Sequence, residues 1–198
     1  MFYSFARFIS RLIQPMLFKV RVYGMENVPE EGGFIFAANH ESYIDPFIMG
    51  TISPRKIHFV ARESLFRNPV FGWIISHCGA FPVRRDSADM RSIKSALSFL
   101  KAGRGMLIFP EGTRFRQDGQ RPIQAGVALL ASKAQVPVLP VYIANSAQVL
   151  PPGAKWFRHE TVDIYIGKPM IVGTKTLYPQ AAEKVMEAVY SLPKYIGE

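Results

Sequence analysis

The chain of 198 residues is predicted to fold as a single α/β domain, with a mostly buried mixed sheet flanked by helices and an amphipathic helix at the amino terminus. Short apolar runs of strand length alternate with segments in which apolar residues recur at helical spacing. Hydrophobic residues make up 48% of the chain, which argues against disorder. The sequence shows no internal repeat, low-complexity segment or domain boundary, so one domain accounts for its length.

The first eighteen residues are predicted to form the amphipathic helix. Its apolar stripe consists of Phe2, Phe5, Ile9, Leu12 and Met16, flanked by Phe8 and Ile13. The opposite face carries Ser4, Arg7, Ser10, Arg11 and Gln14, and the first acidic residue is Glu26. Such a helix either lies in a membrane interface or packs on the protein's own core. The two arginines and the overall positive charge favour the membrane surface.

The remaining elements follow from pattern and from turn residues. Strands are predicted over residues 19–23, 34–38, 56–63, 80–85, 106–109, 136–143 and 161–166, where residues are apolar in succession or alternate with polar ones. Helices are predicted over residues 68–77, 89–101, 123–134 and 179–192. A short helix through residues 47–49 would begin with Asp45 as its N-cap and Pro46 at its first position. Residues 145–160, rich in proline and aromatic side chains, are predicted to be a surface loop.

The composition limits the partners and the compartment. The net charge of +9 and the isoelectric point of about 9.8 indicate an anionic partner, either nucleic acid or a membrane surface with phosphate-bearing substrates. The single cysteine, Cys78, excludes an internal disulfide and indicates a reducing compartment, and its apolar neighbours are typical of a small buried side chain. No apolar run approaches the roughly 20 residues that span a bilayer, and the amino terminus lacks the features of a secretory signal.

Polar segments directly follow two of the apolar strands, where an α/β sheet usually carries its chemistry. In the first segment His40 and Asp45 are five residues apart, so a turn is needed to bring them together. The carboxylate would then hold one imidazole nitrogen and leave the other to accept a proton. The alternative is a surface turn whose histidine has no role.

Other catalytic chemistries do not fit the sequence. A zinc-protease helix opening at His40 would need its second histidine at Ile44, and neither a Gly-x-Ser-x-Gly elbow nor a phosphate loop is present. The Cys and His residues are too few and too scattered for a metal cluster. Without a protein nucleophile, the base would activate a hydroxyl group of the substrate.

The second polar segment, residues 109–114, suits a phosphate-bearing ligand. Gly112 permits a tight turn and a close backbone approach, while Thr113 and Arg114 add donors. Further arginines end other strands, Arg62 after residues 59–61 and Arg84 with Arg85 after residue 83. Their repeated placement at strand ends indicates a shared phosphate pocket.

Taken together, these residues resemble the glycerolipid acyltransferase family, and in particular the bacterial 1-acyl-glycerol-3-phosphate acyltransferases. Four blocks of the family appear in order within residues 20–175. They are Asn39-His40-x-Ser42-x-x-Asp45-Pro46, Gly79-Ala80-Phe81-Pro82-Val83-Arg84-Arg85, Phe109-Pro110-Glu111-Gly112-Thr113-Arg114 and Val136-Pro137-Val138-Leu139-Pro140-Val141. The first and third blocks are specific, whereas the second and fourth would carry little weight alone. Residues 1–18 would then be an interfacial helix and residues 19–198 the acyltransferase domain.

The resemblance implies a mechanism and a substrate. His40 would take the proton from the acceptor's hydroxyl, with Asp45 orienting it, and the alkoxide would attack the thioester of acyl-CoA or acyl carrier protein. The acceptor would be lysophosphatidic acid and the product phosphatidic acid, made without a cofactor or metal by a peripheral enzyme on the cytoplasmic face of the cell membrane.

The resemblance also assigns the glycerol phosphate to Arg85 and to Glu111, Gly112, Thr113 and Arg114. Members often carry lysine in an Ala-Lys-x-Glu segment, where this chain has Arg62 between Ala61 and Glu63. Arginine keeps the charge and changes the geometry, so a phosphate role for Arg62 follows less directly.

Two alternatives stay open. One keeps the chemistry and changes the acceptor to glycerol-3-phosphate or another lysophospholipid, which the arginine pattern does not separate. The other is a non-catalytic basic module that binds RNA or membranes. That module would explain the charge and the amphipathic terminus but not the two polar segments. Because the aromatic residues lie mostly in apolar runs rather than among Lys and Arg, nucleic acid is not the expected partner.

Overall fold

A computed structural model describes residues 2–83, 90–112, 123–151, 153–154, 156–174 and 176–195. The described part is built around a seven-stranded mixed sheet with the order β1-β7-β6-β2-β5-β3-β4. Its strands are β1 (Lys19–Tyr23), β2 (Phe34–Ala38), β3 (Ile57–Arg62), β4 (Ala80–Val83), β5 (Gly105–Ile108), β6 (Val138–Ala144) and β7 (Thr161–Ile166). The five strands from β6 to β4 run parallel, and β7 is antiparallel to β6.

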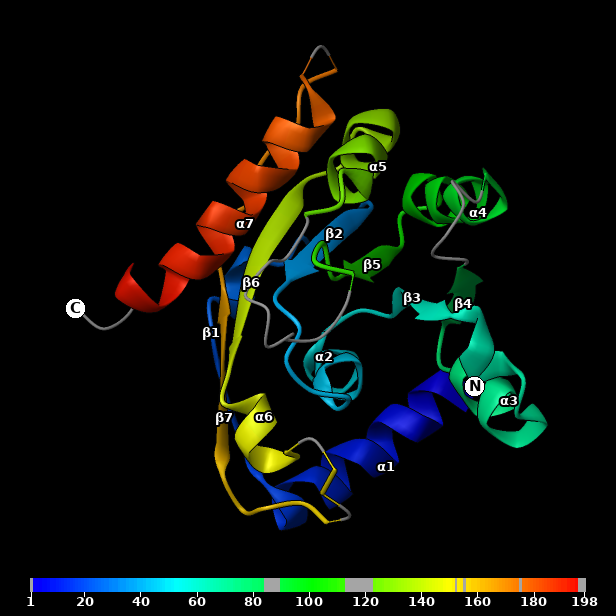
Figure 1. Ribbon diagram of the computed structural model, residues 1–198, viewed down its shortest axis with the longest axis vertical. Coiled ribbons are helices and arrows are strands. Elements are labelled where there is room, and N and C mark those ends of the chain that lie inside the picture. Colours follow the sequence, from blue (N-terminus) through cyan, green and yellow to red (C-terminus); the bar gives the residue numbers. More distant parts are fainter. Residues whose placement is uncertain are drawn as a thin grey trace.

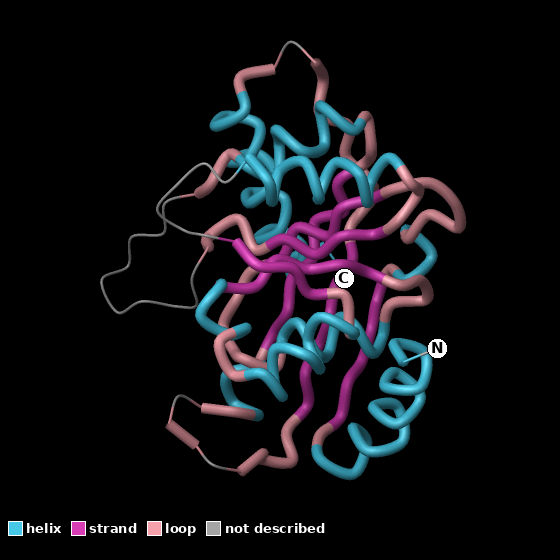
Figure 2. Tube along the Cα trace, turned by 90° about the vertical axis from the view of Figure 1, so that its right-hand side faces the viewer, coloured by secondary structure: helices cyan, strands magenta, loops and turns pink. Residues whose placement is uncertain are grey.

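Helices cover both faces of the sheet, as Figures 1 and 2 show. One face is covered by α4 (Met90–Lys101), α5 (Gly126–Ala134) and α7 (Tyr178–Tyr195). The other carries α2 (Asp45–Ile52), with α1 (Phe2–Leu17) beside it and the single turn α6 (Ser146–Val149) near β7. Helix α3 (Pro69–His77) and the 3-10 turn η2 (Glu63–Phe66) connect β3 to β4, and a second turn, η1 (Met25–Asn27), follows β1.

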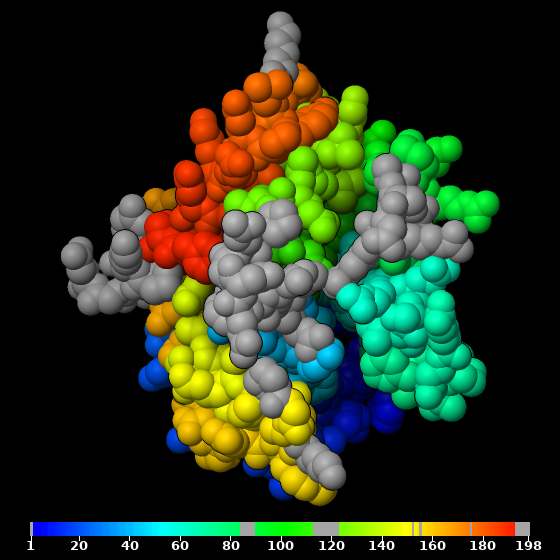
Figure 3. Space-filling model, viewed as in Figure 1, coloured from blue at the N-terminus to red at the C-terminus, as the bar shows by residue number. Residues whose placement is uncertain are grey.

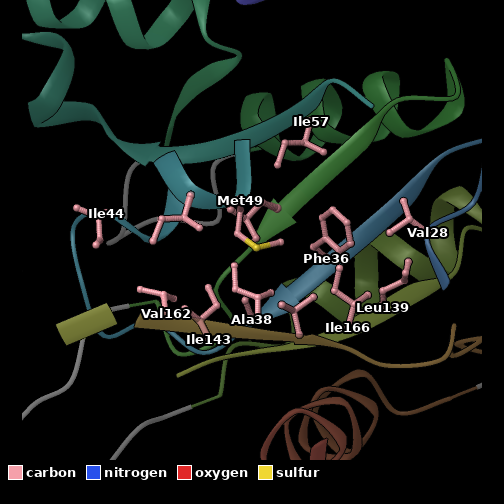
Figure 4. Close-up of a cluster of buried hydrophobic side chains, with 14 of the residues drawn as sticks. Val28, Phe36, Ala38, Ile44, Met49, Ile57, Leu139, Ile143, Val162 and Ile166 are labelled. Carbon is pink, nitrogen blue, oxygen red and sulfur yellow. The ribbon is translucent and has the colours of Figure 1, made fainter. Parts of the chain in front are cut away.

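The central strand β2 explains why its sequence is apolar without interruption. All five of its residues are buried. Phe34, Phe36 and Ala38 face the α2 side, whereas Ile35 and Ala37 face α4, α5 and α7. A strand covered on both faces needs apolar side chains at every position. On the α2 side, Met49 packs with Phe36 and with residues of β6 and β7 (Figure 4).

The predicted strands and long helices are confirmed, with boundaries shifted by a few residues. The prediction of a loop over residues 145–160 missed α6, because one helical turn leaves no periodic signal. Asp45 is not the N-cap of α2. It is the first residue of that helix, and its carboxylate points back to the preceding loop instead of capping forward. Cys78 is half-buried, and burial raises the pKa of its thiol.

Helix α1 forms as predicted, but its polar face is turned toward the protein. The Arg7 guanidinium donates to the carbonyl oxygens of Ser53 and Pro54 at 2.9 and 3.2 Å, and Arg11 Nε donates to Thr51 O at 3.0 Å. These carbonyls lie at the carboxyl end of α2, where cationic donors are favourable. Both arginines, whose charge favoured a membrane surface in the sequence, thus contact α2 in the structure.

The apolar stripe of α1 points away from the core. Its exposed side chains are Phe5, Phe8, Leu12, Ile13 and Met16, with exposed fractions from 47% to 79%. Helix α1 thus packs on the protein through its polar face, and most of its apolar stripe is left exposed. Within the described residues, no helix has the length and apolar content needed to cross a membrane.

Candidate active site

The candidate site lies where the carboxyl ends of four neighbouring parallel strands form one edge of the sheet. The strands β2, β5, β3 and β4 lie side by side in that order, so their carboxyl ends meet at this edge. The chain leaves β2 toward His40 and leaves β5 toward the Phe109–Gly112 segment. Arg62 is the last residue of β3 and lies opposite Val83, the last residue of β4. The topology thus brings both polar segments to the same place, as expected for an α/β sheet.

Asn39 fixes the point at which the chain leaves β2. Its side-chain amide donates to Ile143 O at 2.9 Å, and its Oδ1 accepts from Ile143 N at 2.7 Å. The amide therefore imitates a peptide group and extends the pairing of β2 with β6 by one step. Asn39 is fully buried. The motif in the sequence contains Asn39 but does not predict its role. Its partner is the backbone of Ile143, which is 104 residues away in the chain and leaves no pattern in the sequence.

The loop after Asn39 closes around the carboxylate of Asp45. Asp45 Oδ2 lies 2.8 Å from His40 Nδ1 and accepts from the backbone nitrogens of Glu41 and Ser42 at 2.9 and 2.8 Å. Asp45 is completely buried, so these three donors offset the loss of hydration of its charge. Among the described residues no donor reaches its second oxygen, Oδ1. The predicted contact between His40 and Asp45 is confirmed.

Two contacts fix the imidazole of His40. On one side Asp45 accepts from Nδ1, which makes the neutral ring the Nδ1–H tautomer and leaves Nε2 unprotonated. Across its face the ring stacks on Phe109, with ring centroids 4.0 Å apart and an interplanar angle of 20°. The His40 side chain is 16% exposed. The arrangement is suited to a base that takes a proton on Nε2 from a group entering at the sheet edge.

The second segment makes a tight turn after β5. Gly112 N donates to Phe109 O at 2.9 Å, and Gly112 has a φ of +64°. A Cβ at this glycine would lie 2.3 Å from Gln124 Nε2. The positive φ therefore favours glycine, and any other residue would also have to displace the end of the Gln124 side chain. The same turn places the ring of Phe109 against His40, so the two polar segments support one another.

Glu111 ties this turn to the last helix. Its side chain is buried, and the hydroxyl of Tyr190 in α7 donates to Glu111 Oε1. Tyr190 in turn packs edge-on against Tyr142 of β6, with ring centroids 5.9 Å apart. No local pattern connects Tyr190 with the site, because it lies in an ordinary amphipathic helix, 79 residues from Glu111 along the chain.

The predicted phosphate-binding residues are placed in part. Arg62 is exposed and stands at the site edge. Arg85, Thr113 and Arg114 lie outside the described residues, although Arg85 follows β4 and Thr113 follows Gly112. Their predicted roles stay predictions. Within the described ranges no three His, Cys, Asp or Glu side chains are grouped in a way that could hold a metal ion.

Comparison with known proteins identifies the family. The sequence profile described as Acyltransferase matches residues 19–144. The chain belongs to this acyltransferase family. It is 31% identical to the 1-acyl-sn-glycerol-3-phosphate acyltransferase of Bacillus subtilis, over 85% of this chain and 82% of that enzyme. It is also 32% identical to the lyso-ornithine lipid O-acyltransferase of Pseudomonas aeruginosa, over 72% of this chain and 54% of that enzyme.

A solved structure extends the likeness to the whole fold. The crystal structure of the 1-acyl-sn-glycerophosphate (LPA) acyltransferase PlsC from Thermotoga maritima superposes with a TM-score of 0.82 at 25% identity. The match covers 99% of this chain and 80% of that protein. The α/β fold and the acyltransferase class expected from the sequence are therefore confirmed.

The bridge made by Asn39 predicts a measurable loss of stability. Asn39→Ala would leave the buried N–H and C=O groups of Ile143 without partners, which costs about 1–3 kcal/mol. We expect urea denaturation to show this loss. Gln148→Ala, which removes an exposed side-chain bond, is the matched control and should stay within about 0.5 kcal/mol. An Asn39→Ala protein as stable as the control would contradict the bridging role.

Proposed function

We propose that this chain transfers a fatty acyl group from an acyl thioester to the free hydroxyl of 1-acyl-glycerol-3-phosphate, giving phosphatidic acid. One observation carries the proposal. A His40–Asp45 pair stands at the carboxyl edge of the sheet in a chain that resembles, over most of its length, enzymes named for this reaction. The family accounts for the acyl transfer, and the similar enzymes suggest the acceptor.

The proposed chemistry follows from the geometry of His40. Its Nε2 takes the proton of the acceptor hydroxyl as the oxygen attacks the thioester carbonyl. The tetrahedral intermediate then collapses, the C–S bond breaks, and the imidazolium returns its proton to the departing thiolate. Asp45 is within 2.8 Å of Nδ1 and stabilises the imidazolium that forms between these steps. The reaction as written balances without a metal ion or a cofactor, and the acyl donor is acyl-CoA or acyl carrier protein.

The proposed acceptor phosphate lies away from the base along the same edge. Arg62 ends β3, which is two strands away from β2 in the sheet. Neighbouring strands are spaced about 4.7–4.9 Å apart, so the ends of β2 and β3 are roughly 10 Å apart. This span suits a glycerol phosphate whose hydroxyl meets His40 while its phosphate meets arginines. We infer that Arg62, Arg85 and Arg114 supply the charge and that Gly112 and Thr113 let the backbone approach. Glu111 holds the turn that presents them, through its bond to Tyr190.

The acceptor can be decided by assay. The similarity to a lyso-ornithine lipid O-acyltransferase makes a second lysolipid a specific alternative. Purified protein should be tested with acyl-CoA and acyl carrier protein donors against 1-acyl-glycerol-3-phosphate, glycerol-3-phosphate and lyso-ornithine lipid. We expect the highest kcat/KM with 1-acyl-glycerol-3-phosphate. A preference for lyso-ornithine lipid would reassign the acceptor and leave the chemistry in place.

Substitution of the pair tests the catalytic roles. His40→Ala removes the base and should lower kcat by about 10² to 10⁴ with the acceptor KM little changed. Asp45→Asn should also lower kcat, because an amide nitrogen facing Nδ1 favours the opposite tautomer. His159→Ala, at an exposed histidine outside the site, is the control and should keep wild-type turnover. Substantial turnover by a folded His40→Ala protein would refute the general-base role.

We further propose that α1 holds the protein on the cytoplasmic face of the membrane, where a lysolipid acceptor and its product reside. The exposed stripe of Phe5, Phe8, Leu12 and Met16 supports this, because burial of several such side chains in a bilayer interface is favourable. The packing of α1 refines the mode of binding. Since Arg7 and Arg11 bind α2, the apolar side chains provide most of the contact.

Vesicle binding tests the role of α1. The variant Phe5→Gln/Phe8→Gln/Leu12→Gln should lose most of its binding to phosphatidylglycerol vesicles and keep its unfolding midpoint, because these side chains are exposed. A control variant, Ile171→Gln/Leu177→Gln, removes two exposed apolar side chains from the segment before α7, on the opposite face of the sheet, and should bind as the wild type does. Equal binding by all three proteins would rule out α1 as the membrane contact.

A further inference from the structure

Helix α3 is an apolar helix that the described part of the chain leaves uncovered. The exposed apolar side chains of α3 and η2 are Leu65, Val70, Phe71, Trp73 and Ile74, with exposed fractions from 40% to 69%. Gly72 is the buried residue of α3. A surface helix normally turns its apolar residues toward the core and its polar residues toward water. Here the apolar residues face outward, and Figure 3 shows the segment around residues 63–77 as a lobe at the right-hand side.

This exposure is built into well-formed local structure. Asn68 caps α3 by accepting from Phe71 N at 3.0 Å, and Pro69 occupies the first turn. The inward side of the helix is glycine. A Cβ at Gly72 would lie 3.0 Å from the Cα and the carbonyl oxygen of Phe66. Because α3 meets η2 through a glycine, its large side chains are directed away from the body of the protein.

An aromatic cluster joins α3 to α1. The Phe2 ring of α1 lies edge-on to Trp73 and to His77, with centroids 5.0 and 5.5 Å apart, and Trp73 packs on His77 at 4.2 Å. Figure 1 shows the amino terminus of α1 beside α3. The surface formed by α1 and α3 therefore has exposed apolar side chains on both sides of an aromatic junction, and that junction contains a tryptophan. Tryptophan is enriched where proteins meet the headgroup region of a membrane.

The charges of this surface match anionic lipids. Residues 2–17 and residues 64–83 contain no acidic residue, and Glu63 at the start of η2 is the acidic residue next to them. Arg67 is exposed in the connection between η2 and α3. Lys56 places its ammonium group 5.3 Å from the centre of the Tyr3 ring, on the α1 side of the junction. Apolar side chains bordered by cations suit a bilayer interface with anionic headgroups.

We propose that α3 is a second membrane-docking helix, which inserts its exposed apolar side chains beside those of α1. The inference rests on the proposal that α1 lies on the membrane. One helix lying in an interface leaves the domain free to roll about that helix, whereas two joined helices fix its orientation. Because Arg62 is separated from α3 only by residues 63–68, docking of α3 also brings the end of β3 close to the lipid headgroups.

The first test measures vesicle binding of an α3 variant. Val70→Gln/Phe71→Gln/Ile74→Gln should bind phosphatidylglycerol vesicles about tenfold or more weakly than the wild type, since three apolar side chains are lost from the interface. Its acyl transfer to a detergent-dispersed acceptor should be unchanged, because α3 is outside the proposed catalytic site. The Ile171→Gln/Leu177→Gln variant is again the control. Full binding by the α3 variant, with binding lost in the α1 variant, would overturn the role of α3 and leave that of α1 standing.

The second test needs no change in α3. The chain has two tryptophans, so Trp156→Phe makes Trp73 the single reporter. On adding phosphatidylglycerol vesicles, we expect the Trp73 emission to shift to shorter wavelength and to be quenched by lipids brominated on their acyl chains. An unchanged emission from protein that sediments with the vesicles would overturn the proposal.

Two other occupants of this surface give different results. If α3 binds a second copy of the chain, the wild type would sediment as a dimer without lipid and the α3 variant as a monomer. If α3 binds acyl carrier protein, the variant would show a raised KM for that donor alone and unchanged vesicle binding. Either result would replace the membrane as the partner of α3. Loss of transfer in detergent by the wild type would instead count against the proposed function.

Discussion

The site depends on one buried carboxylate. Asp45 Oδ2 receives the His40 ring nitrogen and two backbone N–H groups within 2.9 Å, and these bonds give the loop between β2 and α2 its shape. An ionised carboxylate without water is strongly unfavourable unless donors surround it. Burial of Asp45 therefore requires the loop to close around it. The position of the imidazole follows from that closure.

The rest of the architecture supports this arrangement from three sides. Asn39 anchors the start of the loop to β6, and α2 anchors its end by packing Ile48 and Met49 into the core. The turn after β5 brings Phe109 against the ring of His40. Two of these supports come from β6 and β5, the parallel neighbours of β2 on either side, so the sheet is what makes them converge. Tyr190 extends the same framework to α7 through Glu111.

The sequence predicted those features that repeat or that obey a local rule. Strand β2 was predictable because burial on both faces leaves an unbroken apolar run, and the contact of His40 with Asp45 because both lie within one turn. The partners of Asn39 and Glu111 were not predictable. Ile143 contributes only its backbone, and Tyr190 lies in a helix whose pattern is explained by burial. Such contacts arise from the tertiary arrangement and leave no mark on neighbouring residues.

Helix α1 shows what an amphipathic pattern leaves undecided. Its amphipathicity was evident, but the pattern does not say which face meets the protein. The unsatisfied carbonyls at the end of α2 attract Arg7 and Arg11, which turns the polar face inward and exposes Phe5, Phe8 and Met16. The outward direction of the apolar residues of α3 has an equally local cause, the close approach of Gly72 to Phe66. Together these contacts leave apolar side chains on the outside, which is unfavourable in water and favourable against lipid.

Asp45 holds His40 as the Nδ1–H tautomer, with Nε2 free to take a proton. Nitrogen-15 NMR of the imidazole distinguishes the two tautomers directly, and comparison with the His40→Ala protein assigns the His40 signals. In the neutral state we expect the shift of a protonated nitrogen at Nδ1 and that of an unprotonated nitrogen at Nε2, with the pattern lost or reversed in Asp45→Asn. A neutral ring protonated at Nε2 in the wild type would contradict the account, because its base would then point at the carboxylate instead of the substrate.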